Sequence, residues 1–376
     1  MVIFFFLVGL EIKRELLVGE LSNTRAALLP IAAAAGGATV PALLYLGLNF
    51  GGVGSDGWAI PMATDIAFAL GVLSLLGSRV PFGLKVFLTA VAIVDDLIAV
   101  LMIALFYAGE LNSWALSIGL VVLALLALAN LVGLRSPLIY GALGVVVWLA
   151  FLESGVHATI AGVLVALTVP ARSRLDPAAF LDQSRRLLDE FAESSLEPNR
   201  MLTEERQQAI VIELEDLSEG VQAPLQKMEH TLHPWVFFLI MPIFALANAG
   251  VAISSNAFSG GALPVVLGVV LGLVVGKPLG LLLASWLVVR AGLATLPAGV
   301  SWVQLAGAGL LAGIGFTMSL FITSLAFGAL PEVLAAAKIG ILLASVVAGA
   351  LGLACLNRAG REQTPVNGSP ALQDVS

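Results

Sequence analysis

Long apolar stretches recur along most of the chain, and they constrain its fold more than any other feature. Most hold about 20 residues, the length at which a helix crosses the roughly 30 Å hydrocarbon core of a bilayer. A helix pairs its backbone polar groups within its own segment, as a lipid-exposed backbone must. The eleven stretches are residues 1–13, 27–49, 58–78, 83–108, 114–133, 137–152, 156–170, 235–253, 264–290, 303–327 and 333–356. They predict an all-α polytopic membrane protein.

The composition agrees with this fold class. Hydrophobic residues make up 59% of the 376 residues and charged residues only 11%, whereas a soluble domain carries about 25% charged residues. The single cysteine, Cys355, excludes an internal disulfide, and no grouping of Cys and His is typical of zinc or iron–sulfur sites. We expect no cofactor and no nucleic-acid partner, and the lipid bilayer as the surroundings.

The Lys and Arg residues predict the orientation. When the loops are assigned alternately to two sides, only Lys277 and Lys338 of the 18 basic residues fall outside one side. By the positive-inside rule this side is cytoplasmic, so we expect a protein of the cell inner membrane with a cytoplasmic C-terminus. The first stretch is short and the number of stretches is odd, so we also expect a further helix upstream of Met1.

Two segments depart from the membrane pattern. Residues 171–228 mix charges with Leu, Ile and Phe at helical spacing, which predicts a cytoplasmic excursion of amphipathic helices between membrane parts 1–170 and 229–358. The excursion is either a solvated insertion without a function of its own or a regulatory module. The tail 359–376 is rich in Pro, Gly, Ser and Gln, and we expect it to be disordered.

Four ionisable residues lie near the middle of their apolar stretches: Asp65, Asp95, Asp96 and Lys277. Each buried charge costs about 2.5–3.5 kcal/mol at the centre of a membrane helix, so such residues mark ion or proton pathways. The alternative for any single one is an interhelical hydrogen bond. Neighbouring helical residues point about 100° apart, so one of Asp95 and Asp96 can pair with Lys277 while the other faces a cavity.

Two of the stretches have features of interrupted helices. Gly313 and Gly315 lie at the middle of 303–327, and the stretch 58–78 contains Pro61 and Gly71 close to Thr64 and Asp65. The alternative for the glycines is close helix packing, which we assign to the ladder Gly268, Gly272, Gly276 and Gly280. The two stretches occupy corresponding places in three-helix units, residues 27–108 and 264–356. Interrupted helices in matching positions are typical of transporters with inverted repeats.

Eight motifs, in order along the chain, resemble those of the NhaA-type sodium/proton antiporters. They are GLEIKREL (9–16), GWAIPMATDIAFALGVLSLLGSRVP (57–81), AIVDDLIA (92–99), SGVHATIAGV (154–163), LHPWV (232–236), FALANAGV (244–251), GKPLG (276–280) and GIGFTMSLFI (313–322). The resemblance implies an NhaA-like fold of inverted three-helix repeats with two discontinuous, crossing helices. It also implies that family members form homodimers through a segment that this chain lacks, so a homodimer is left open.

The resemblance assigns roles to the buried charges. It implies that Asp96 and Asp65 bind Na⁺ or Li⁺ with Thr64 nearby, and that Asp95 pairs with Lys277 when the cation is absent. Carboxylate oxygens suit such hard cations. Protons compete for the same carboxylates, which couples the two flows. The expected function is pH-regulated exchange of cytoplasmic Na⁺ or Li⁺ for external H⁺ by alternating access, without enzymatic activity.

Five further residues are candidates for the pH response. Glu11, Arg14 and Glu15 end the first apolar stretch, and Glu229 lies where the excursion re-enters the membrane. The alternative for the first three is an ordinary charged helix end. His157 is either a packing residue or a sensor, since an unperturbed histidine titrates near pH 6.5.

Three other functions compete with antiport. A sodium-coupled solute symporter is the nearest, and it differs in that an organic solute changes the Na⁺ flux. An intramembrane aspartyl protease also uses two buried aspartates, but its GxGD motif is absent. A cation channel is disfavoured by the buried Lys277, because cation pores carry rings of acids or carbonyls.

Overall fold

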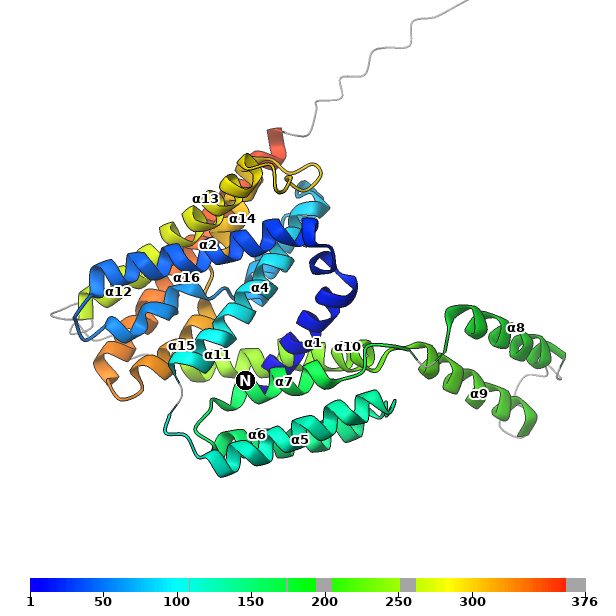
Figure 1. Ribbon diagram of the computed structural model, residues 1–376. Coiled ribbons are helices and arrows are strands. Elements are labelled where there is room, and N and C mark those ends of the chain that lie inside the picture. The colour runs from blue at the N-terminus through cyan, green and yellow to red at the C-terminus, as the bar shows by residue number, and fades with distance from the viewer. Residues whose placement is uncertain (108, 174, 194–204, 251–261, 363–376) are drawn as a thin grey trace, which may run out of the picture. The chain divides into compact units, whose positions relative to one another are not determined.

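The computed structural model describes residues 1–107, 109–173, 175–193, 205–250 and 262–362 (Figure 1). Every regular element in these ranges is a helix, so the predicted all-α class is confirmed. In this part of the chain seven helical runs are long and apolar enough to cross a membrane, and an eighth is added if one bent helix pair counts as a span. Two shorter apolar helices, Pro137–Glu153 and Ala158–Thr168, complete the set.

The elements follow one another with short connections. In chain order they are α1 (Val2–Val18), η1 (Glu20–Ser22), α2 (Thr24–Asn49), η2 (Ser55–Met62), α3 (Ile66–Ser74), η3 (Gly77–Arg79), α4 (Phe82–Phe106), α5 (Ser113–Leu131), α6 (Pro137–Glu153), α7 (Ala158–Thr168), α8 (Pro177–Glu193), α9 (Glu205–Val221), α10 (Pro224–Trp235), η4 (Val236–Ile240), α11 (Met241–Ala249), α12 (Leu263–Leu271), η7 (Gly272–Gly276), α13 (Lys277–Arg290), α14 (Trp302–Ala312), α15 (Phe316–Phe327) and α16 (Pro331–Glu362).

The chain forms two compact units, and each takes up two separate stretches of sequence. The first unit comprises Met1–Arg14 and Gly109–Leu239, and the second comprises Glu15–Ala108 and Ile240–Ser376. The four ionisable residues near the middle of apolar stretches, Asp65, Asp95, Asp96 and Lys277, all belong to the second unit.

In the first unit, α5, α6 and α7 pack against one another. The predicted excursion contains α8 and α9, which pack together, and each of the two helices has a buried apolar residue, Leu187 and Ile210. The stem of the excursion is closed, because the backbone N–H of Leu225 donates to the carbonyl of Pro170 at 3.1 Å. The two ends of the predicted excursion therefore lie next to each other.

Some helix boundaries differ from the prediction. The apolar stretch expected from residue 235 belongs to a helical run that begins at Pro224, inside the predicted excursion, and Glu229 lies within this run. Proline suits the first turn of a helix because its missing N–H is not needed there. The first helix, expected to end at residue 13, continues to Val18.

In the second unit, α2 packs along the continuous run of α12, η7 and α13. Part of the predicted glycine ladder lies in this contact: a Cβ on Gly276 would lie 2.9 Å from the Pro41 Cα, and one on Gly280 would clash with the Gly36 carbonyl oxygen, both on α2. The ladder therefore serves close packing, as the sequence predicts.

Two helices of the second unit are interrupted. The turns of η2 end at Met62, and α3 begins at Ile66 after a short non-helical segment. The helices α14 and α15 meet at an angle of 44° across residues 313–315. Gly71, noted in the sequence near the first interruption, lies within α3 and causes no break. The two interruptions bring non-helical backbone into the interior of the unit.

Candidate functional site: a buried ionic cluster at two helix breaks

Asp95 and Lys277 form an ion pair in the interior of the second unit. The Lys277 Nζ lies 2.6 Å from the Asp95 Oδ2, and the two side chains are 1% and 2% exposed. The same carboxylate oxygen accepts the backbone N–H of Thr64 at 2.8 Å. Lys277 also donates to the carbonyl oxygen of Met62, the last residue of η2. A cation there offsets the partial negative charge of a helix C-terminus.

Asp65 caps two helices with one carboxylate. It is the N-cap residue of α3, where its Oδ1 accepts the backbone N–H of Phe68 at 3.2 Å. Its Oδ2 accepts the backbone N–H of Thr317 at 3.0 Å and also the Thr317 hydroxyl, in the first turn of α15. The negative charge of Asp65 thus faces the positive ends of two helix dipoles.

Further hydrogen bonds join the non-helical segment before α3 to the one between α14 and α15, and another ties the start of α15 to α16. The Thr64 hydroxyl donates to the Ala312 carbonyl at 2.9 Å, and the Asp65 N–H donates to the Ile314 carbonyl at 2.7 Å. The Phe316 N–H, at the start of α15, donates to the Ser345 hydroxyl at 3.2 Å. Non-helical backbone at membrane depth needs such partners within the protein.

Gly313 and Gly315 lie at the second break, where the sequence predicts them. A Cβ on Gly313 would clash with the Leu273 carbonyl oxygen, and one on Gly315 would clash with the Ser319 hydroxyl. Glycine is needed at these positions for close approach and not for positive φ, because both residues have right-handed backbone conformations.

Asp96 is 1% exposed and lies on α4 directly after Asp95. The carboxylate of the residue before it, Asp95, is the one that pairs with Lys277. Among the residues that the structure describes, no three of His, Cys, Asp and Glu come close enough together to hold a metal ion. The predicted Na⁺ site needs only the two acids Asp96 and Asp65 with Thr64 nearby, so it stays a prediction.

The predicted pH-response residues are spread over both units. Arg14 and Glu229, in the first unit, form an ion pair at 3.2 Å. Glu11 lies in α1 and is half-buried. Glu15 belongs to the second unit, where its carboxylate accepts the Glu20 N–H at 3.1 Å.

His157 lies apart from the Arg14–Glu229 pair within the first unit. It is the N-cap residue of α7, and its Nδ1 lies 2.9 Å from the Thr159 hydroxyl oxygen. The ammonium of Lys13, the residue before Arg14, donates to the Leu167 and Val169 carbonyls at the other end of α7, at 2.7 and 2.6 Å. His157 and the Lys13 ammonium thus lie at opposite ends of α7, whose eleven residues span roughly 16 Å.

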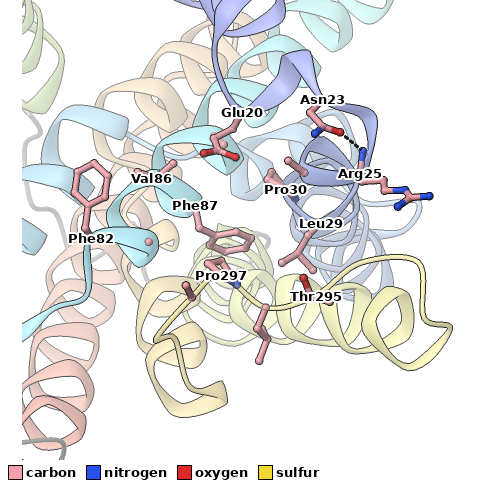
Figure 2. A pocket seen from close by; sticks show the side chains of 15 residues that line it. Glu20, Asn23, Arg25, Leu29, Pro30, Phe82, Val86, Phe87, Thr295 and Pro297 are labelled. Carbon is pink, nitrogen blue, oxygen red and sulfur yellow. Dashed lines mark hydrogen bonds between the residues drawn. The ribbon is translucent and has the colours of Figure 1, made fainter.

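A separate pocket of about 510 Å³ opens at the ends of the helices in the second unit (Figure 2). Its walls come from the start of α2, the start of α4 and the segment before α14. Figure 2 shows the ring of Phe87 inside it and the carboxylate of Glu20 above it. No residue of the ionic cluster lines the pocket, and the residues of α4 that line it lie between Phe82 and Ala90.

Thr317 is the site residue that the sequence analysis missed. It is fully buried and directly bonded to Asp65. The available signal was its place in GIGFTMS, two residues after the glycine at the break. A hydroxyl residue in the first turn of a helix that starts at membrane depth is a candidate ligand, even where no charged residue is near it in sequence.

Comparisons with known proteins show which sequences this chain is similar to. Residues 1–356 match the sequence model of a family described as Na⁺/H⁺ antiporter 1. A protein of Oleidesulfovibrio alaskensis named Na(+)/H(+) antiporter NhaA is 52% identical over 349 residues, which cover 93% of this chain and 77% of that protein. A protein of the same name from Koribacter versatilis is 50% identical over 379 residues, covering 100% of this chain and 81% of the relative. Syntrophotalea carbinolica has an NhaA 2 that is 51% identical over 361 residues, with 96% and 82% covered.

Proposed function

Because the chain belongs to the Na⁺/H⁺ antiporter family, we propose that it exchanges cytoplasmic Na⁺ or Li⁺ for external H⁺ by alternating access. The observation that carries this proposal is the Asp95–Lys277 pair, buried directly beside Asp96. A permanent buried charge without function is costly, whereas carboxylates that are in turn protonated, paired or cation-bound are seldom bare.

Asp96 and Asp65 are the proposed cation ligands. A carboxylate offers about four lone-pair sites, so Asp65 keeps acceptor capacity beyond its bonds to Phe68 and Thr317. Lys277 neutralises Asp95 while no cation is bound. Protons and Na⁺ compete for the aspartates, and this competition couples the two fluxes, with the titration belonging to the group as a whole.

The orientation and regulation follow from the charges outside the cluster. We assign the basic loops and the C-terminus to the cytoplasm of a cell inner membrane. The Arg14–Glu229 pair is the proposed element of pH regulation, and the side chains of these residues are 36% and 14% exposed. Glu11, Glu15 and His157 are further candidates for this response.

The test is Na⁺-driven proton movement in everted membrane vesicles, followed with a pH-sensitive dye. Asp96→Asn should abolish the signal while the protein still inserts. Asp56→Asn is the control, because it removes an exposed carboxylate of η2 outside the cluster and should leave the signal intact. A normal signal from Asp96→Asn would contradict the assignment. A flux that depends on an organic solute would indicate a symporter.

A further inference from the structure

Thr317 brings a hydroxyl group to the ionic cluster. Its side chain is fully buried in α15, and both of its donors, the backbone N–H and the hydroxyl, bond to the Oδ2 of Asp65. One carboxylate oxygen thus receives two hydrogen bonds from a single residue. The other oxygen, Oδ1, receives the backbone N–H of Phe68.

The two donors of Thr317 differ in what else they can do. A backbone N–H only donates, but a hydroxyl carries two lone pairs and can rotate to present its oxygen. Na⁺ and Li⁺ are hard cations that take oxygen ligands. The hydroxyl is therefore the donor that can change from holding the carboxylate to binding a cation next to it.

We propose that Thr317 is a further cation-binding residue of this protein. In the conformation shown, its hydroxyl holds the Oδ2 of Asp65. When a monovalent cation binds at Asp65, the hydroxyl turns and its oxygen becomes a ligand beside the carboxylate. This inference rests on the proposed antiport function and adds a neutral oxygen ligand to the acidic ones.

The same helix offers a matched control. Thr323 is also fully buried in α15, and its hydroxyl oxygen has no hydrogen-bond partner among the described residues. Thr→Val replaces a hydroxyl with a methyl group of similar size. Thr317→Val and Thr323→Val therefore make the same chemical change at a bonded and at an unbonded position, and both keep the backbone N–H.

The experiment measures initial exchange rates in proteoliposomes against Na⁺ and against Li⁺ concentration at one pH. Thr317→Val should raise the KM for both cations about tenfold or more, the scale expected when one interaction with a charged group is lost. Its maximal rate should stay within roughly twofold of the wild type. Thr317→Ser keeps the hydroxyl and should restore the KM, and Thr323→Val should match the wild type.

Thermal melting of the purified variants separates binding from packing. A purely structural Thr317 would lower the Tm in the valine variant without changing the KM, and that result overturns the inference. An unchanged or lower KM in Thr317→Val, or an equal rise in Thr323→Val, does the same. If the valine variant does not insert, Thr317→Ala removes the same hydroxyl without adding a methyl group and takes its place.

The proposed function fails on different evidence. If the wild-type protein moves no protons in response to Na⁺ or Li⁺, or if Asp96→Asn exchanges normally, the antiport assignment is wrong. An inactive Asp96→Asn together with an unaltered Thr317→Val leaves antiport in place and rejects only the role of Thr317.

Discussion

Lys277 and Asp95 lie on different helices and meet at 2.6 Å, Nζ to Oδ2, with almost no solvent exposure. The residues are 182 positions apart in the chain, so their contact depends on the packing of α13 against the rest of the second unit. The pair links α4 to α13, and its two charged groups belong to the proposed transport site. Its stability and its transport role can be tested separately.

Removal of the lysine should destabilise the protein. Lys277→Ala leaves Asp95 buried without its main cationic partner, and breaking a buried pair costs about 3–5 kcal/mol. Lys277→Arg should lose less, because it keeps the charge. Thermal unfolding in detergent measures the effect, with the half-buried Lys338→Ala as control. Equal melting of wild type and Lys277→Ala would show that the pair does not form in the protein.

Removal of the aspartate should stop transport. Asp95→Asn is expected to abolish Na⁺-driven proton movement, since an amide can neither release a proton nor pair with the ammonium. Adding Lys277→Gln to this variant should recover part of its stability, because residues in contact couple by about 0.5–3 kcal/mol. A double-mutant cycle of unfolding free energies gives the coupling. Strict additivity would contradict it.

The second break should not tolerate a side chain. Gly313→Ala drives a methyl group into the Leu273 carbonyl, and overpacking of this kind costs about 1–3 kcal/mol. Gly71→Ala is the matched control: no atom lies within 4 Å of its Cβ position, and alanine favours the helix by up to about 1 kcal/mol. Melting temperatures should therefore move in opposite directions. A harmless Gly313→Ala would mean that the close approach is absent.

The excursion should be dispensable for exchange. A deletion of residues 173–221 with a short Gly-Ser join keeps the bond between Pro170 and Leu225 and leaves α10 in place. Because α8 and α9 are rich in acids, we expect a change in apparent Na⁺ affinity that shrinks at 1 M salt, where the Debye length is about 3 Å. Loss of exchange in a folded, inserted deletion variant would place the excursion in the transport path.

Much of the fold was predictable because lipid imposes strong rules on sequence. The apolar stretches follow from the bilayer thickness, and the glycine ladder from the need for close helix packing. The start of α10 was harder to predict, because residues 224–234 are amphipathic and resemble the preceding excursion. The sequence placed the break between η2 and α3 imprecisely, because a glycine inside a helix, such as Gly71, cannot be told from a glycine at an interruption by sequence alone.

The site was predictable in its charges but not in its geometry. Adjacent aspartates on one helix differ only in direction, so helix geometry could not decide whether Asp95 or Asp96 meets Lys277, and only the family resemblance implied Asp95. Backbone partners leave no trace in side-chain patterns, which is why the bonds from Thr64 to Asp95 and from Lys277 to Met62 were not expected. Thr317 was missed because a threonine in an apolar helix is unremarkable until its neighbours are known.

Because Asp65 caps both α3 and α15, it couples the movements of the two interrupted helices. Its carboxylate holds the first turns of α3 and α15 together, and its N–H holds the end of the α14 side. If α3 or α15 rotates, the other helix must therefore move with it, or the hydrogen bonds between Asp65 and one of the two helices must first break. Substitutions on the two helices near this residue should consequently have non-additive effects, even where their side chains do not touch.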